Sequence, residues 1–106
     1  MTYTKVNYHE SDPVSDGLHF LREPLETDQL GVSVLDCDPG WTGMEHDHAD
    51  ENHEEVYLLI EGEATVRIEG EAVDMAEGDA VRVPAEATRQ IENGDTESQF
   101  VLVGAP

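Results

Sequence analysis

The sequence predicts an all-β protein, an antiparallel sandwich or barrel, on the strength of two observations. Short runs rich in β-branched and apolar residues recur along the chain, and turns containing Gly, Asp, Asn or Pro separate them. No segment shows the periodicity of a helix that could connect parallel strands. With 106 residues, the chain is long enough for one domain with a single modest core.

The expected strands are short, and tight turns separate most of them. In chain order they cover residues 17–21, 31–37, 55–60, 64–68, 71–75, 79–83, 88–92 and 99–103. Glycine recurs in the turns, at Gly62, Gly70, Gly78 and Gly94, where it permits the backbone conformations that tight turns require. The polar segment 1–16 is expected to form an edge strand or an arm.

Side-chain alternation indicates which strands have one buried face and which have two. Residues 64–68 alternate between apolar and polar side chains, so this strand should be half buried. The segments 56–60 and 100–103 are apolar throughout, so both of their faces should be covered. One face can fill the barrel, and a second sheet or a second subunit would cover the other, so we predict a homodimer. The side chains expected to face a second layer are Val56, Leu58 and Ile60.

The charge of the chain is extreme. Aspartate and glutamate number 25, lysine and arginine number 5, and the formal net charge is -20. Repulsion of this size destabilises a compact state unless salt screens it. Many acids with almost no lysine resemble the composition of proteins from halophilic archaea, which fill their cytosol with salt. Such a surface makes nucleic acid and anionic membranes poor partners.

Cysteine content and hydropathy indicate the compartment. Cys37 is the only cysteine, so no disulfide can form within the chain, and we expect it to be a small buried apolar residue. No apolar stretch approaches the length of a membrane span, and residues 1–20 lack the basic start and apolar run of a signal peptide. We therefore expect the protein to be cytoplasmic.

Three histidines and several carboxylates lie between Gly40 and Gly62, just ahead of an apolar strand. His46 and His48 should project from one face of an extended segment, because side chains in strands repeat every two residues. Two imidazoles and one carboxylate form the three-ligand face of non-haem iron sites, which leaves positions open for substrate or oxygen. Glu55, at the start of the apolar strand, is the candidate carboxylate.

The spacing of these residues resembles the first motif of the cupin superfamily. That motif has a glycine, five residues, a His-x-His pair, a spacer, a glutamate, six residues and a second glycine. Here five residues separate Gly40 from His46, and six separate Glu55 from Gly62. The spacer between His48 and Glu55 has six residues, which is longer than is usual in the family.

The chain is also similar to the second cupin motif. Gly78 is followed after five residues by Pro84, and Asn93 stands at the distance that the motif requires. Two positions differ: Glu86 replaces a glycine, and Arg89 replaces the histidine that binds metal in the family. A guanidinium stays protonated and has no lone pair to donate, so Arg89 cannot be a metal ligand.

The resemblance covers about residues 30–103 and is to small single-domain cupins of the cupin-2 type. It implies a double-stranded β-helix, or jelly-roll barrel, that is often dimeric and carries its metal site inside the barrel mouth. The chain would then be one domain. Its N-terminal arm or edge strand would cover about residues 1–29, and the barrel about residues 30–103.

Three interpretations of the cluster remain open. In the first, a divalent ion such as Fe, Mn, Ni or Zn binds to His46, His48 and Glu55, and Arg89 holds an anionic group of the substrate. In the second, no metal binds, Arg89 pairs with Glu55, and the barrel holds a small molecule or nothing. In the third, the histidines lie on a flexible acidic loop.

Other side chains bear on the site. His53 lies two residues before Glu55 and shares its face if the strand extends back, so it could replace another imidazole or complete a fourth ligand position. Tyr57 shares the face of Glu55 and is expected to line the pocket and contact a ligand. Arg89 shares a face with Ile91 and should point inward.

Fold alone does not decide function, since cupins include dioxygenases, isomerases, decarboxylases, sugar-binding regulators and storage proteins. The first hypothesis is a small metal-dependent enzyme of oxygenase type that acts on a small anionic substrate. The second hypothesis is a metal-free protein of the same fold that binds a small molecule and uses Arg89 as an anchor for an anionic group.

Overall fold

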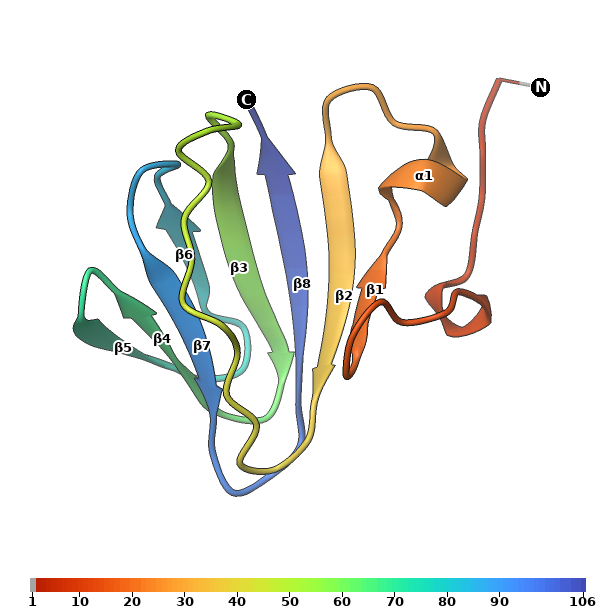
Figure 1. Cartoon of the computed structure of the whole chain (residues 1–106). Coiled ribbons are helices and arrows are strands. Elements are labelled where there is room, and N and C mark those ends of the chain that lie inside the picture. The colour runs from red at the N-terminus through yellow and green to blue at the C-terminus, as the bar shows by residue number, and fades with distance from the viewer. Residues whose placement is uncertain (1) are drawn as a thin grey trace.

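The computed structural model describes residues 2–106, which form two antiparallel β-sheets (Figure 1). The five-stranded sheet has the order β1-β2-β8-β3-β6, and the three-stranded sheet has the order β5-β4-β7. The strands are β1 (Leu18–Phe20), β2 (Gly31–Cys37), β3 (Glu54–Glu61), β4 (Ala64–Ile68), β5 (Glu71–Met75), β6 (Ala80–Val83), β7 (Arg89–Asn93) and β8 (Ser98–Ala105). Two short helices precede β2, the 3-10 helix η1 (Tyr8–Glu10) and α1 (Arg22–Leu25). The predicted all-β class is confirmed.

The core lies between the two sheets. Leu59 of β3, Val66 of β4 and Phe100 of β8 are each 0% exposed and belong to one cluster. Alternate residues of each strand enter this core because strand side chains point to opposite faces. Cys37 is buried at the end of β2, as predicted. Burial raises the pKa of its thiol to about 11, so the thiol keeps its proton at neutral pH.

The turn between β3 and β4 depends on Gly62. Its φ is +88°, and a Cβ at this position would lie 2.4 Å from the carbonyl oxygen of Glu97. A side chain is therefore excluded both by the left-handed backbone and by the segment that leads into β8. The turn lets the chain leave the five-stranded sheet and begin the second one.

Residues 41–48 run beside β7 without forming a regular strand (Figure 1). His46 and Arg89 exchange two backbone hydrogen bonds: the His46 N–H donates to the Arg89 carbonyl at 3.0 Å, and the Arg89 N–H donates to the His46 carbonyl at 2.8 Å. The backbone N–H of His48 donates to the carbonyl of Ala85 at 2.9 Å. These bonds attach the histidine segment to the barrel and argue against a flexible loop.

Every predicted strand is present, with its ends displaced by no more than two residues. The helix α1 is absent from the predictions, because four residues are too few to show a helical period. Its sequence, Arg-Glu-Pro-Leu, places the proline in the first turn, where no hydrogen bond is lost. Neither helix within residues 2–106 has the length and apolar character needed to cross a membrane.

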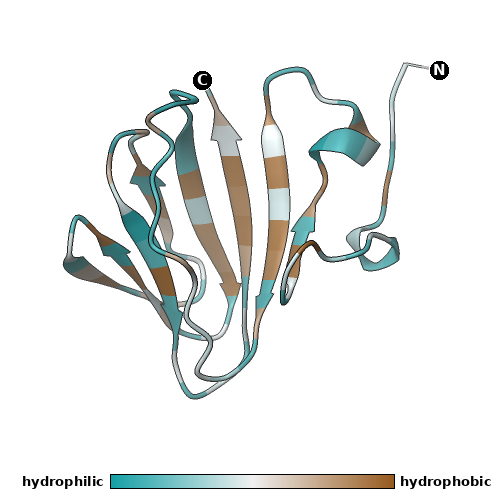
Figure 2. Cartoon of the chain, in the orientation of Figure 1, coloured by the Kyte–Doolittle hydropathy of each residue, from teal (hydrophilic) through white to brown (hydrophobic). Residues whose placement is uncertain are grey.

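The two faces of β3 differ in burial. Tyr57 and Leu59 are buried between the sheets, whereas Val56 and Ile60 are 38% and 46% exposed. No second sheet of the described chain covers Val56, Leu58 and Ile60, so the alternative that a second subunit covers them stays a prediction. Figure 2 shows the apolar residues that run along β2, β8 and β3. The outer face of these strands is apolar, and the segment before β1 covers only part of it: Val34 is 9% exposed, and the hydroxyl of Tyr8 accepts a hydrogen bond from the side chain of Gln99 at 2.9 Å.

Candidate metal centre

Glu55 and Tyr57 lie near the start of β3, on the face directed into the barrel. In register with β8, Glu55 is opposite Gly104 and Tyr57 is opposite Leu102. Gly104 leaves room for the glutamate, because a Cβ at residue 104 would lie 3.1 Å from Cγ of Glu55. The strand thus places a carboxylate at the end of the barrel where β3 begins, with a buried phenol next to it.

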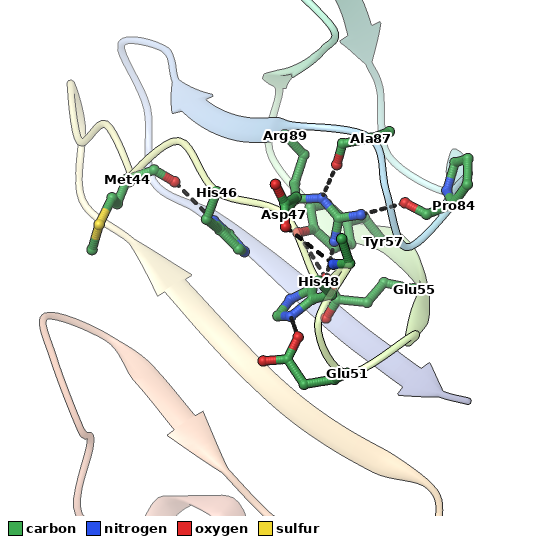
Figure 3. A network of polar contacts seen from close by, with 11 residues as sticks. Met44, His46, Asp47, His48, Glu51, Glu55, Tyr57, Pro84, Ala87 and Arg89 are labelled. Carbon is green, nitrogen blue, oxygen red and sulfur yellow. Dashed lines mark hydrogen bonds and ion pairs between the residues drawn. The ribbon is translucent and has the colours of Figure 1, made fainter.

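His46 and His48 approach Glu55 from the segment beside β7 (Figure 3). One ligand atom from each of the three side chains lies within 4.8 Å of the others. Nε2 of His48 is 3.1 Å from Oε1 of Glu55, and the two imidazole rings are 5.0 Å apart. The side chains that the sequence nominates as ligands are therefore brought together by the fold.

Each imidazole has its Nδ1 turned toward an oxygen outside the cluster. Nδ1 of His46 lies 3.0 Å from the carbonyl oxygen of Met44, and Nδ1 of His48 lies 3.5 Å from Oε2 of Glu51. In His46 we assign the ring proton to Nδ1, because it then faces an acceptor; this tautomer leaves the lone pair on Nε2, as a metal ligand requires. In His48 the nearer acceptor, Oε1 of Glu55 at 3.1 Å, faces Nε2, so Nε2 would exchange this contact for an ion, and Glu51 would then accept from Nδ1 and orient the ring.

Oε1 of Glu55 is the centre of a hydrogen-bond network (Figure 3). Nη1 of Arg89 donates to it at 2.9 Å, and the hydroxyl of Tyr57 donates at 3.1 Å. Burial, followed by the negative charge of Glu55, raises the pKa of the Tyr57 hydroxyl, so Tyr57 keeps its proton and remains a donor. Within residues 2–106, no side chain or backbone group donates to Oε2 of Glu55, which leaves that oxygen available as a ligand atom.

Arg89 lies behind Glu55 and does not line a cavity. Its side chain is 0% exposed, whereas that of Glu55 is 16% exposed. Nε of Arg89 donates to the carbonyl oxygen of Ala87 at 3.0 Å, and Nη2 donates to the carbonyl oxygen of Pro84. The guanidinium thus joins Glu55 to the turn between β6 and β7. Contact with an anionic ligand, as predicted for Arg89, would require its side chain to move.

A cavity of about 340 Å³ opens beside the cluster and is large enough for a small organic molecule. His46, His48, Glu55 and Tyr57 form part of its wall. The apolar part of the wall includes Leu18, Leu35, Trp41, Ile91 and Leu102. The cavity therefore combines a small polar cluster with an apolar surface, as is usual for sites that bind small molecules.

His53 and Glu51 are the two residues whose places differ most from the sequence patterns. His53 is outside the ligand cluster and lines a second cavity, of about 640 Å³, to which Glu55 also contributes. Glu51 would be read from the sequence as part of a solvated acidic run, yet it contacts His48. Its position three residues after His48 is the signal that could have identified it.

The three side chains fit a divalent ion. Two neutral imidazoles and a carboxylate suit Fe, Mn, Ni or Zn. Two ligand atoms that each lie about 2.1 Å from a metal are at most about 4.2 Å apart, and the three ligand atoms here lie within 4.8 Å of one another, so a small shift of the side chains would bring them around one ion. The charge of Arg89, 2.9 Å from Glu55, opposes the ion and should lower its affinity.

Comparison with known proteins places the chain in a family. Residues 33–104 match the family model described as Cupin domain. A cupin protein of Bacteroides fragilis is 24% identical with a TM-score of 0.81, and the match covers 99% of this chain and 85% of that one. A protein described as a sugar phosphate isomerase from a cupin superfamily, of Silicibacter pomeroyi, is 21% identical with a TM-score of 0.79, over 96% of this chain and 75% of that one. A predicted oxalate decarboxylase of Thermotoga maritima is 21% identical with a TM-score of 0.80, over 95% of this chain and 97% of that one.

The search of curated proteins found no match. The structural similarities extend over nearly all of the chain and agree with a double-stranded β-helix. The family match includes both the histidine segment and the strand that carries Arg89. The chain therefore belongs to the cupin family.

Proposed function

We propose that the protein is a metal-dependent cupin enzyme that acts on a small anionic molecule. The observation that carries this proposal is the convergence of His46, His48 and Glu55, within 4.8 Å of one another, at the wall of an apolar cavity. Three protein ligands leave coordination positions open, and the cavity is the space in which a substrate would reach them.

A divalent ion bound there would supply a Lewis acid that polarises an oxygen atom of the substrate. Two imidazoles and one carboxylate are also the ligand set of non-haem iron oxygenases, so an oxygen-dependent reaction is the type that we favour. Within the chain, Tyr57 keeps its proton and fixes Glu55 by a hydrogen bond of 3.1 Å. The apolar part of the cavity wall would shield one side of a bound substrate from water.

The charges at the site favour an anionic substrate. Arg89 and Glu55 carry opposite charges and cancel, so a divalent ion would give the centre a net charge of about +2. In a chain with a formal net charge of -20, such a centre would be a local point of attraction for anions. The names of two similar structures, a sugar phosphate isomerase and an oxalate decarboxylase, refer to small anionic compounds. In this proposal Arg89 does not touch the substrate. It holds Glu55 in place by its hydrogen bond and offsets the negative charge of that carboxylate.

The ion pair between Arg89 and Glu55 supports a second candidate function, a metal-free protein that binds a small molecule. Their separation is 2.9 Å, and Oε1 of Glu55 already has Arg89, Tyr57 and His48 around it. A carboxylate with these neighbours is stable without a metal ion. The same cavity would then bind a small ligand through its apolar wall.

Calorimetric titration of the metal-free protein with Fe(II), Mn(II), Ni(II) and Zn(II), in buffer with molar salt, tests the two candidates. The metal-dependent function predicts one ion per chain in the wild type and loss of binding in His48→Ala. His53→Ala is the matched control, because His53 lies outside the cluster and should leave affinity unchanged.

Arg89→His separates the alternatives. It removes the opposing charge and adds a ligand, so binding should become tighter by about tenfold or more if the wild type already binds metal. Absence of binding to the wild type together with clear binding to Arg89→His would establish the metal-free function. Binding that survives His48→Ala would overturn the assignment of the ligands.

A further inference from the structure

Two cavities meet at the metal cluster. The cavity of about 340 Å³ beside the histidines and the larger one of about 640 Å³ share four wall residues, Phe20, Ser33, Glu55 and Leu102. The larger cavity is lined by Glu55 of β3, Phe20 of β1, Arg22 of α1 and Gly31 at the start of β2. Figure 1 shows where these elements lie in the fold. The two cavities therefore adjoin next to the cluster.

Arg22 is the only lysine or arginine on the wall of either cavity, within residues 2–106. Three other arginines have carboxylate partners: Arg67 pairs with Glu92, Arg82 with Glu54, and Arg89 with Glu55. Arg22 forms no ion pair with any residue of the described part of the chain, although acids outnumber bases 25 to 5.

The side chain of Arg22 is nevertheless held in place. Its Nη2 donates to the carbonyl oxygen of Asp28 at 2.7 Å. This bond restrains the guanidinium and leaves the donors on Nε and Nη1 for another group. Fixed guanidinium donors suit the two oxygens of a carboxylate or the oxygens of a phosphate.

We propose that Arg22 forms a second anion subsite and that the substrate is an elongated organic anion. One end would reach the His46, His48 and Glu55 cluster, and the other end would carry a carboxylate or phosphate bound by Arg22. This proposal extends the proposed function. It rests on that function for the claim that one end of the substrate binds at the metal cluster. The middle of the molecule would cross Phe20 and Leu102, which are apolar, and Ser33, which can donate or accept a hydrogen bond.

The walls of the larger cavity also limit what can bind. Asp12 and Glu23 lie on the same wall as Arg22 and would repel an anion that was placed away from the guanidinium. These two carboxylates would accept hydrogen bonds from hydroxyl groups of a ligand. Within the larger cavity, the charge of the ligand would therefore lie next to Arg22.

The test compares two probes of equal chain length, adipate and hexanoate, which differ by one terminal carboxylate. Their binding to the Mn(II)-loaded wild type is measured by calorimetry at fixed salt. We expect adipate to bind about tenfold more tightly than hexanoate, because hydrogen bonds to charged groups are the strong ones. In Arg22→Gln this preference should disappear, while the affinity for hexanoate and for Mn(II) should stay as in the wild type.

Arg82→Gln is the matched control, since it removes the same charge from a residue that lines neither of these two cavities. A preference for adipate that persists in Arg22→Gln, or that Arg82→Gln abolishes equally, would overturn the subsite. With 5-phosphonopentanoate as a third probe, which keeps the four methylenes of adipate, tighter binding than adipate would assign the subsite to a phosphate, and weaker binding would assign it to a carboxylate.

The same experiment distinguishes failure of the Arg22 subsite from failure of the proposed metal-dependent function. If the wild type binds no metal, the same probes are compared on the metal-free protein, where contact with Arg22 does not require an ion. A preference for adipate that Arg22→Gln removes would then retain the subsite without the metal. Equal affinity for adipate and hexanoate, or binding of neither probe, would contradict it.

Discussion

Two neighbouring glutamates on β3 point to opposite faces of the five-stranded sheet, and each forms an ion pair with an arginine. Glu54 faces outward and binds Arg82 at 2.7 Å, with the two side chains 53% and 65% exposed. Glu55 faces inward and binds Arg89 at 2.9 Å, with the side chains 16% and 0% exposed. Because strand side chains alternate, a shift of one residue along the chain moves the same chemistry from solvent into the barrel.

The difference between these pairs shows that burial, and not the type of residue, determines what an ion pair does. Water and salt screen the Glu54–Arg82 pair, so it contributes little to stability. The Glu55–Arg89 pair is protected from solvent, and Arg89 also bonds to the carbonyls of Pro84 and Ala87. The inner pair therefore organises the candidate site, whereas the outer pair belongs to the surface.

The largest effect is expected from removing each arginine in turn. Arg89→Met leaves Glu55 buried without its cation and frees two carbonyl groups, so we expect it to lower the free energy of unfolding by about 3–5 kcal/mol. Arg82→Met should lower it by at most about 1 kcal/mol. Urea denaturation in molar salt measures both values. If the two variants lost the same free energy of unfolding, the buried and the exposed ion pair would not differ in their contribution to stability.

A double variant sharpens the same comparison. Arg89→Met combined with Glu55→Leu removes both buried charges, and it should recover about 1–3 kcal/mol of the stability lost in Arg89→Met alone. The recovery is expected because the main penalty in the single variant is a buried carboxylate without a partner. Arg82→Met with Glu54→Leu should show no comparable recovery. A double variant that is less stable than Arg89→Met would mean that Glu55 is stabilised mainly by its other neighbours.

The apolar outer face of the five-stranded sheet leads to a prediction about the oligomeric state. Its central rows in register are Val32–Val103–Val56 and Val34–Val101–Leu58, and neither row contains a carboxylate, although the chain carries 25 acids. A second copy of the chain is the expected occupant, because the same two rows of its own outer face are equally apolar and free of carboxylates. Light scattering in molar salt should give twice the monomer mass of 11.7 kDa.

Val101→Asp would place a charge in the middle of this face and should shift the mass to that of one chain. Thr65→Asp, on the three-stranded sheet, is the control that adds the same charge elsewhere. A monomeric wild type would show that the outer face has no partner of its own kind.

High pH should weaken the inner network through Tyr57. The pKa of Tyr57 is raised in the folded protein above its value of about 10 in an unfolded chain. The stability linked to this group is therefore complete below pH 10 and is lost as the pH rises above it. Urea midpoints at pH 8 and above pH 10 should show a decline that Tyr57→Phe reduces and Tyr3→Phe does not. An identical decline in Tyr57→Phe would assign the effect to other groups.

The smallest effect concerns salt. Raising the salt concentration from about 0.1 M to 1 M shortens the screening length from about 10 Å to 3 Å. The melting temperature of the wild type should rise, because the formal net charge is -20. The small cost of Arg82→Met should vanish at high salt, while the cost of Arg89→Met should persist, since solvent ions do not reach a buried pair. A cost of Arg89→Met that fell equally with salt would show that the inner pair is solvated.

Sequence patterns were sufficient for most of the fold. Period-two alternation and turn glycines such as Gly62 are local properties, so they can be recognised without knowing which strands become neighbours. The same locality explains why His46, His48 and Glu55 could be nominated as ligands. Their spacing and residue types describe a ligand set before any distance is known.

The sequence by itself thus determined the strands, the turns and the candidate ligands. Only the tertiary structure decided that Arg89 lies behind Glu55, that His53 lines a different cavity, and that Arg22 lines that adjoining cavity too. It also decided which face of β3 is buried, since an apolar run fits either face. The physical reason is that a side chain's partners are set by packing between segments far apart in the chain, as with Glu55 and Arg89, which are 34 residues apart.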